Sequence, residues 1–140
     1  MLNRNVRACA AIVFKNGKVL ACKCSEQPNA ELWEFPGVEL TSDEDSQSAC
    51  ERTVVEELGC NPSTAWILDT VDVDYPDHHL AMDCYVCTLL PTDEPNPKAY
   101  GQIRWLGPNE LLEVEWRPEH KEAVCLVGTY WDQLFFSEHL

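Results

Sequence analysis

The stretch that decides the fold is residues 37–60, which run Gly37-Val-Glu-Leu-Thr-Ser-Asp-Glu44-Asp-Ser-Gln-Ser-Ala-Cys-Glu-Arg52-Thr-Val-Val-Glu56-Glu57-Leu-Gly59-Cys60. The pattern predicts a loop, then an acidic helix, then a stop. Asp45 or Ser46 can cap the helix, because either side-chain oxygen can accept a hydrogen bond from a free backbone N–H. Gly59 can take the left-handed conformation that ends a helix. We therefore expect one helix between Asp45 and Gly59.

The two faces of this expected helix differ in chemistry. At about 100° per residue, one broad face carries Arg52, Thr53, Glu56 and Glu57. The other face carries Val54, Val55 and Leu58. Two adjacent carboxylates one turn beyond an arginine, on a helix that follows a glycine loop, can hold a hard divalent cation.

This stretch resembles the Nudix box, whose pattern is G-x5-E-x7-R-E-U-x-E-E-x-G-U, with U a bulky apolar residue. The matching positions are Glu44, Arg52, Val54, Glu56, Glu57 and Gly59, and Leu32-Trp-Glu-Phe-Pro-Gly37 resembles the lead-in to the box. A pattern this long with its spacing intact is far more specific than a three-residue motif. The resemblance implies an α/β (α+β) protein with the Nudix fold, a mixed β-sheet sandwiched between helices, as a single domain over residues 1–140.

Three positions depart from the family pattern. Val38 stands where the box has glycine, and Thr53 replaces a glutamate that is usually a metal ligand and a candidate base. A threonine hydroxyl is a weak neutral ligand and is no general base near neutral pH. Ala99 stands where many relatives have a further glutamate. If Thr53 is a lesion in a competent site, Thr53→Glu should raise the rate.

The resemblance implies attack of water on a nucleoside diphosphate linked to another moiety, with Mg²⁺ as cofactor (Mn²⁺ substituting). Glu56 and Glu57 are the predicted metal ligands and catalytic acids, supported by Glu44 and Arg52. The favoured activity is the nucleotide-pool-sanitising, MutT-like conversion of a (d)NTP to an NMP and pyrophosphate, weakened by Thr53. The alternative is a catalytically impaired Nudix domain that binds a nucleotide or a protein.

Three residues outside the box are candidates for binding the nucleotide. Lys23 lies beside Cys24, which stands where relatives often have an arginine that contacts substrate phosphate. Lys23 either takes the place of that arginine or only faces solvent. Glu119 and Trp116 match an acidic residue that contacts the base and an aromatic residue that stacks on it. A carboxylate accepts from an exocyclic amino group such as cytosine N4. Alternatively, Glu119 is a first-turn acid favoured by the helix dipole and Trp116 is a core residue.

Composition limits the partners. Ten basic and 24 acidic side chains give a net charge of −14, which repels nucleic-acid polymers and anionic membranes. A small nucleotide is repelled too, unless a bound cation reverses the local field. No stretch reaches the roughly 20 apolar residues of a membrane span. We expect a cytoplasmic monomer or homodimer whose eight cysteines are reduced.

The remaining elements follow from periodicity. Strands are expected at 6–14, 18–24, 32–35, 66–75, 80–90 and 103–106, a helical turn at 108–112 and a helix at 118–136. Asn16-Gly17 predicts a two-residue hairpin turn. Cys84 and Cys87 are three apart in a strand, so they should point to opposite faces and act as apolar filler rather than bind zinc. His78 and His79 are expected as exposed turn residues.

Overall fold

The computed structural model describes residues 4–25, 27–41, 43–96 and 101–136. Seven strands form one sheet: β1 (Arg4–Lys15), β2 (Lys18–Lys23), β3 (Trp33–Glu34), β4 (Gly37–Glu39), β5 (Thr64–Asp74), β6 (His78–Thr88) and β7 (Gln102–Leu106). The main order is β3-β2-β1-β6-β5, with β4 paired to β1 and β7 to β2. β1 and β6 run parallel, while the other pairs are antiparallel. The sheet is therefore mixed.

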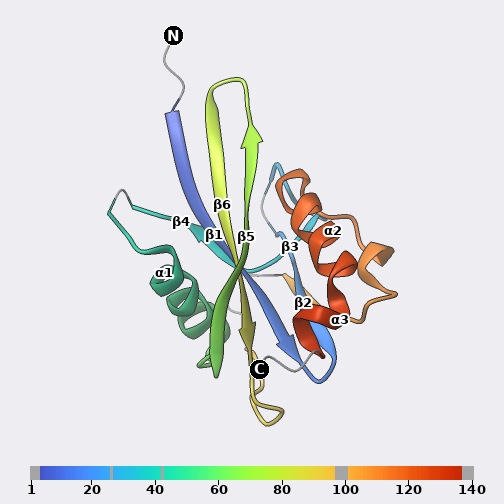
Figure 1. The fold of residues 1–140 in the computed structure, drawn as a ribbon. Helices are drawn as coiled ribbons and strands as arrows, with labels where there is room; N and C mark the ends of the chain where they lie inside the picture. The colour runs from blue at the N-terminus through green and yellow to red at the C-terminus, as the bar shows by residue number, and fades with distance from the viewer. Residues whose placement is uncertain (1–3, 26, 42, 97–100, 137–140) are drawn as a thin grey trace.

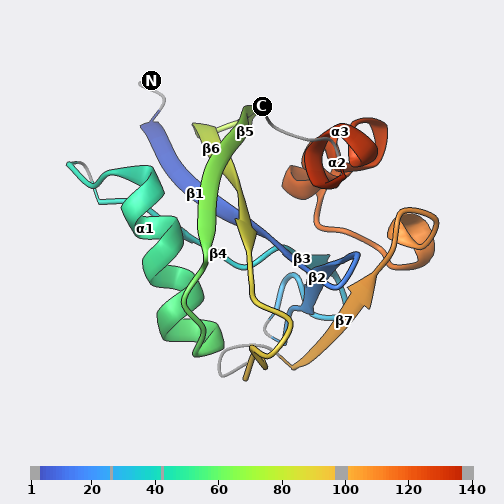
Figure 2. The same ribbon diagram turned by 60° about the horizontal axis from the view of Figure 1, so that its bottom comes forward.

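Helices cover both faces of this sheet, as Figures 1 and 2 show. On one side lies α1 (Ser46–Thr53), which continues as a single π-helical turn, η1 (Val54–Leu58). On the other side lie α2 (Lys121–Thr129) and α3 (Trp131–Phe135). Two short 3₁₀ turns, η2 (Leu111–Glu113) and η3 (Pro118–His120), precede them. The expected sandwich of a mixed sheet between helices is confirmed.

Strand alternation divides the core into two apolar layers. Along β1, Ala10 and Ile12 face the layer that contains Trp131, whereas Ala11 and Val13 face the layer that contains Val54. Successive side chains of a strand point to opposite faces. Each fully buried valine or isoleucine contributes about 1.5–3 kcal/mol, so both helical layers are held to the sheet mainly by β1 and its neighbours.

Cysteines fill these layers. All eight lie in the described part of the chain and all are free thiols, seven of them buried and Cys125 exposed. Cys84 belongs to the layer under α2 and Cys87 to the layer under α1. The prediction that they point to opposite faces is confirmed.

Local backbone geometry fixes two turns and one close approach. Asn16 and Gly17 have φ of 52° and 77°, as the hairpin prediction required. Gly59 closes η1 with φ 71°, which confirms the predicted stop. At Gly37 a Cβ atom would lie 2.2 Å from the carbonyl oxygen of Cys9. Only glycine therefore lets β4 pair with β1 at this point.

The C-terminal helix differs from the expectation of one helix over 118–136. It is divided into η3, α2 and α3, and the break falls at Tyr130, with φ −106° and ψ 20°. The break turns the last residues onto β1, where Phe135 stacks on Phe14 with ring centroids 4.1 Å apart. Tertiary packing overrides the helical periodicity here.

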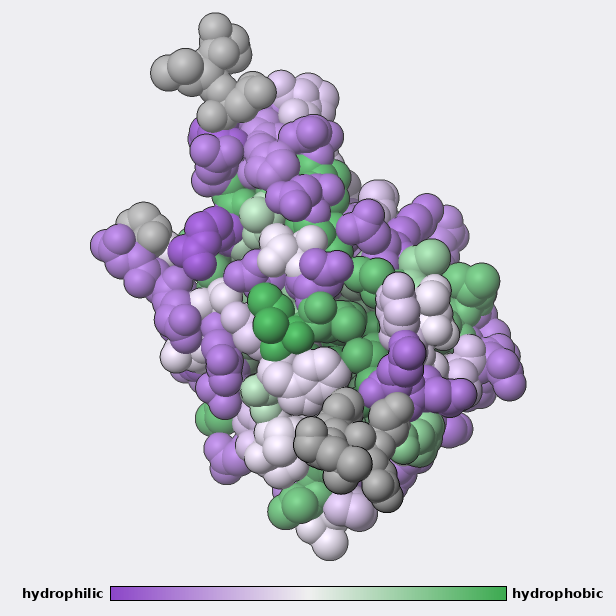
Figure 3. All heavy atoms as spheres, viewed as in Figure 1, coloured by the Kyte–Doolittle hydropathy of each residue, from purple (hydrophilic) through white to green (hydrophobic). Residues whose placement is uncertain are grey.

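The outer surface matches the acidic composition. Hydrophilic side chains occupy the margins of the face in Figure 3, and hydrophobic ones gather near its middle. Among the described residues, no helix has both the length and the apolar character needed to cross a bilayer.

Candidate active site

The box helix begins at an N-cap that the sequence supplies. The Asp45 side chain accepts hydrogen bonds from the backbone N–H and the hydroxyl of Ser48, each at 2.9 Å. These two bonds lower the pKa of Asp45. Of the two capping residues considered, Asp45 is the one used, and Ser46 instead makes a buried hydrogen bond to Tyr85 at 2.7 Å.

Arg52 lies between two of the box acids. Its NH2 is 2.6 Å from Oε2 of Glu44, and its Nε is 3.9 Å from Oε1 of Glu56. Glu44 is 18% exposed and also accepts from the backbone N–H of Thr41 at 3.2 Å. The structure thus brings Glu44, Arg52 and Glu56 together, and the better-anchored pair is Arg52 with Glu44.

The paired glutamates sit on the π-helical turn. Glu56 is 66% exposed. Glu57 affects Cys22 on β2. Burial is the main cause that raises the pKa of Cys22 well above its ordinary value, and the charges of Glu34 and Glu57 raise it further. Glu57 and Glu34 therefore both lie within electrostatic range of Cys22. π-Helical turns occur often at functional sites.

The donor set suits a cation that arrives with phosphate. In the described ranges, no group of three or more His, Cys, Asp or Glu side chains is placed so that it could hold a metal ion by itself. Mg²⁺ is commonly held by one or two carboxylates, with substrate phosphates and waters completing the shell. The two carboxylates of Glu56 and Glu57 fit that role, but they do not form an all-protein cage.

Thr53 does not extend this set. It is 3% exposed, and its hydroxyl donates to the carbonyl of Ala49 at 2.9 Å. It faces the interior beneath α1, so neither a ligand nor a base is available at this position. Val38 pairs with Cys9 in the β4–β1 ladder. Ala99 lies outside the described residues.

A pocket of about 560 Å³ opens next to the box lead-in. Apolar side chains of β1 and β6 line one part of it: Val6, Ala8, Leu80 and Met82. Polar groups line another part: Glu34, Tyr75, His78, Arg117, Glu119 and His120. An apolar pocket with a few convergent polar groups is typical of ligand sites.

Arg117 joins the polar groups into a network. Its NH1 donates to Glu34 at 2.8 Å and its Nε to Glu119 at 3.0 Å. The hydroxyl of Tyr75 donates to the other oxygen of Glu119 at 2.7 Å. Burial alone would raise the pKa of Glu119, but the bond from Tyr75 and the Arg117 charge hold it below its ordinary value. Burial and the bond to Glu119 raise the pKa of Tyr75 to about 12.

Cys24 occupies the end of β2, where relatives often have arginine. Its thiol donates to Glu34 at 3.0 Å. Burial, followed by that hydrogen bond, raises the pKa of Cys24 to about 12, so the thiol stays protonated. Glu34 therefore receives bonds from both Cys24 and Arg117.

His120 lies at the inner end of the network, with 5% of its surface exposed. Its Nδ1 accepts the backbone N–H of Phe35 at 3.2 Å. Burial, then the Arg117 charge, lowers the pKa of His120 to about 4. The ring is therefore neutral near pH 7, with its proton on Nε2.

The β5–β6 hairpin differs from its prediction. His78 and His79 lie on β6 rather than in a turn. His78 stacks on Tyr75 with ring centroids 4.6 Å apart and lines the pocket. His79 bonds Asp74 at 2.6 Å and Asp72 at 2.9 Å, and these bonds raise its pKa. Sequence spacing did not reveal these carboxylates, because they lie across the hairpin.

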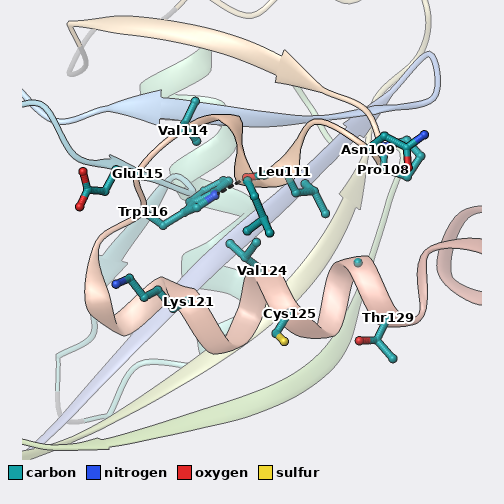
Figure 4. Close-up of a pocket in the computed structure, with 12 residues that line it drawn as sticks. Pro108, Asn109, Leu111, Val114, Glu115, Trp116, Lys121, Val124, Cys125 and Thr129 are labelled. Carbon is teal, nitrogen blue, oxygen red and sulfur yellow. Dashed lines mark hydrogen bonds between the residues drawn. The ribbon is translucent and has the colours of Figure 1, made fainter.

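Two predicted binding residues lie elsewhere. Trp116 is 3% exposed, packs on Phe35 and donates its ring N–H to the carbonyl of Leu111 at 2.7 Å (Figure 4). This burial favours the alternative that Trp116 is a core residue over the prediction that it stacks on a base. Lys23 does not line the 560 Å³ pocket and is paired with Glu31 at 2.7 Å. The structure thus keeps Lys23 apart from Glu119.

A second pocket, of about 620 Å³, lies between η2 and α2 (Figure 4). It is lined mainly by apolar residues around Leu111 and Val124, and no residue of the box stretch 37–60 lines it, whereas Gly37 and Val38 line the 560 Å³ pocket. The site chemistry lies in the smaller pocket. The sequence analysis predicted Glu119 in this pocket but missed Tyr75, Arg117 and His120. Arg117 and His120 could have been found because they flank Glu119 in the chain, whereas no sequence signal pointed to Tyr75.

Known proteins resemble this chain in sequence and fold. An 8-oxo-dGTP diphosphatase of Proteus vulgaris is 38% identical over 57 residues, which cover 41% of this chain and 51% of that protein. The chain thus spans about half the length of this curated relative. The E. coli ORF135 protein superposes with a TM-score of 0.80, 20% identity and 96% coverage of both chains.

The MutT Nudix hydrolase of Burkholderia pseudomallei superposes with a TM-score of 0.77 and 23% identity, covering 89% of this chain and 99% of that one. At such identities the two structures establish the fold alone. The NUDIX domain family matches residues 4–127. The chain therefore belongs to the Nudix family.

Proposed function

We propose that this chain is a metal-dependent Nudix pyrophosphohydrolase that converts a nucleoside triphosphate to the monophosphate and pyrophosphate, in the manner of nucleotide-pool-sanitising enzymes. The observation that carries the proposal is that the acidic box helix packs against β4, and that Gly37, Val38 and Glu39 of β4 line the 560 Å³ pocket. Glu34, just before β4, lines the same pocket and binds Arg117. The name of the Proteus relative supports the same class of reaction.

Each part of the site then has a role. Glu56 and Glu57 hold the cation against the phosphates, and Arg52 fixes the rotamers of Glu44 and Glu56. The pocket with Glu119 holds the nucleoside. A cation held there, Mg²⁺ with Mn²⁺ as a substitute, would neutralise phosphate charge and lower the pKa of the attacking water. The charge of −14 makes that neutralisation necessary for any nucleotide to approach.

One observation favours a second candidate, a Nudix domain that binds a nucleotide without hydrolysing it. The hydroxyl of Thr53 is buried and bonded to Ala49, so the position that usually carries a base contributes none. Loss of a positioned base typically costs about 10²–10⁴-fold in rate. Slow turnover and no turnover are therefore the two outcomes to separate.

The test is release of pyrophosphate from a panel of canonical and oxidised nucleoside triphosphates, with Mg²⁺ titrated at each substrate. We expect Mg²⁺-dependent release that Glu56→Gln abolishes. Glu51→Gln is the matched control, because Glu51 lies about 140° round the helix from Glu56. Nucleotide binding without turnover on the whole panel would support the binding module instead.

A further inference from the structure

His120 is held in one orientation by the chain around it. Its Nδ1 accepts the backbone N–H of Phe35 at 3.2 Å, and its ring lies against that of Phe35 with centroids 5.9 Å apart. Because Nδ1 is an acceptor in this bond, the neutral ring carries its hydrogen on Nε2. The side chain thus offers one fixed donor.

That donor has no partner within the protein. In the described ranges, Nε2 of His120 makes no hydrogen bond. Every side-chain nitrogen or oxygen atom there that is completely shielded from solvent does have a hydrogen-bond partner, so Nε2 is not one of the shielded atoms. Nε2 therefore reaches an open surface. The residue is 5% exposed and lines the 560 Å³ pocket, so that surface is the pocket wall. A buried donor aimed into a pocket is most stable when a ligand supplies an acceptor.

Glu119, the next residue, offers the complementary group. Its Oε1 already accepts from Arg117 at 3.0 Å and its Oε2 from Tyr75 at 2.7 Å. Each oxygen therefore keeps a further lone pair that faces no other donor of this network. A single additional donor needs only one remaining lone pair. The carboxylate is therefore suited to one amino group.

The rest of the pocket suits a heteroaromatic ring rather than phosphate. Val6, Leu80 and Met82 supply an apolar surface for a ring face. The carboxylates of Glu34 and Glu119 line the polar end, and their two charges against the single charge of Arg117 disfavour an anion there. The phosphates then lie on the side of the box helix.

We propose that His120 determines base specificity: Nε2–H donates to an unprotonated ring nitrogen while Glu119 accepts from the exocyclic amino group beside it. On the Watson–Crick edge this pair of groups occurs in cytosine (N3 and the 4-amino group) and adenine (N1 and the 6-amino group), whereas guanine and uracil carry an N–H there. The inference rests on the proposed function only in assuming that a nucleotide occupies the pocket. It assigns a role to a residue that neither the box nor the Glu119 prediction singled out.

The test removes the ring nitrogen from the ligand. Binding of dCMP and 3-deaza-dCMP, and of dAMP and 1-deaza-dAMP, is measured by isothermal titration with the full chain. Each analogue keeps the amino group and lacks only the acceptor. We expect at least about a tenfold loss of affinity for the analogue of the preferred base, because a buried donor is left unpaired. The pair that shows the loss identifies cytosine or adenine as the base.

Variants of His120 test the same contact from the side of the protein. His120→Asn keeps an acceptor for the Phe35 N–H and lacks a donor that reaches the position of Nε2, so the parent and deaza ligands should bind equally. His120→Gln, which carries a donor at that reach, should recover part of the discrimination. Lys121→Gln is the matched control, since Lys121 is the adjacent residue and lines the other pocket.

The outcomes separate this inference from the proposed function. If both deaza ligands bind wild-type protein as tightly as their parents, or if His120→Asn keeps the discrimination, the inference is overturned even where triphosphates are hydrolysed. If no triphosphate is hydrolysed but the deaza effect is present and lost in His120→Asn, the inference stands and only the hydrolase proposal fails.

Discussion

The acidic end of the site, on α1 and η1, is open and loosely held, whereas the end at residues 117–120 is enclosed and held by a hydrogen-bond network. Glu56 is 66% exposed, and its contact with Arg52 is 3.9 Å long. Glu119 is 14% exposed and has a short bond to each carboxylate oxygen. The enclosed end is preorganised for a ligand, while the open end needs a cation and phosphates to become ordered.

The largest expected effect tests the open end. Glu56→Gln removes a charge from the proposed metal site with little change in shape, and we expect turnover to fall by about 10²–10⁴-fold. Because Glu56 is exposed, the free energy of unfolding should change by less than about 1 kcal/mol. Pyrophosphate release and urea denaturation of the same samples measure both. A loss of stability that matches the loss of rate would contradict a role at the metal.

Thr53→Glu has the next largest expected effect, and it compares an acid at the buried position 53 with the exposed acid Glu56. From the sequence alone this change should raise the rate. Since Thr53 is 3% exposed, the new carboxylate must be buried or must move the helix, and we expect a loss of about 3–5 kcal/mol. Thr53→Val, which removes only the bond to Ala49, should cost about 1 kcal/mol. Equal stabilities of the two variants would show that position 53 opens to the site.

Gly37→Ala tests the strand that lies between the two ends. The added Cβ meets the backbone oxygen of Cys9 at 2.2 Å, so β4 must move away from β1, at a cost of about 3 kcal/mol. Gly101→Ala is the control, because its nearest neighbour, Cβ of Ser25, lies at 3.5 Å. Thermal unfolding compares the two, and an unchanged midpoint for Gly37→Ala would refute the close approach.

The enclosed end also predicts a pH dependence. The pKa of His120 is lowered to about 4, so between pH 6.5 and 4 the unfolded chain binds more protons than the folded one. Stability should therefore be greatest above pH 6.5 and fall by up to about 3 kcal/mol as the pH drops to 4. Urea denaturation across this range should show a shallower slope in His120→Asn. An identical slope would place the titrating group elsewhere.

The smallest effect concerns the ion pairs of Arg52. Arg52→Lys keeps the charge but loses the fork that spans Glu44 and Glu56. We expect about a tenfold lower kcat at saturating Mg²⁺ with a stability change below about 1 kcal/mol. Steady-state kinetics with a metal titration measures it. A defect that excess metal fully removes would assign Arg52 to metal affinity rather than to the orientation of the acids.

Local signals in the sequence were sufficient for much of the fold. Asn16-Gly17, Asp45 and Gly59 act through their own backbone, so the hairpin, the helix start and the helix end were predictable. The division of the last helix at Tyr130 was not, because it depends on packing against Phe14, more than a hundred residues away. The box pattern likewise singled out Glu44 and Arg52, and the structure pairs them.

The enclosed end of the site was largely hidden in the sequence. Tyr75, Glu34 and His120 line one pocket only because the turn after β5, strand β3 and η3 come together in space. Trp116 illustrates a related difficulty: the sequence allowed either a base-stacking or a core position, and the ring is buried in the core. A residue type in a suitable place does not say which way the side chain points.

The most direct test of the account is Mn²⁺ binding, followed by electron paramagnetic resonance, with and without a non-hydrolysable nucleoside triphosphate analogue. Because no protein cage of three ligands exists among the described residues, wild-type protein should bind the ion weakly alone and at least about tenfold more tightly with the analogue. The double variant Glu56→Gln/Glu57→Gln should lose that gain. An equal gain in the double variant would show that these acids do not hold the metal.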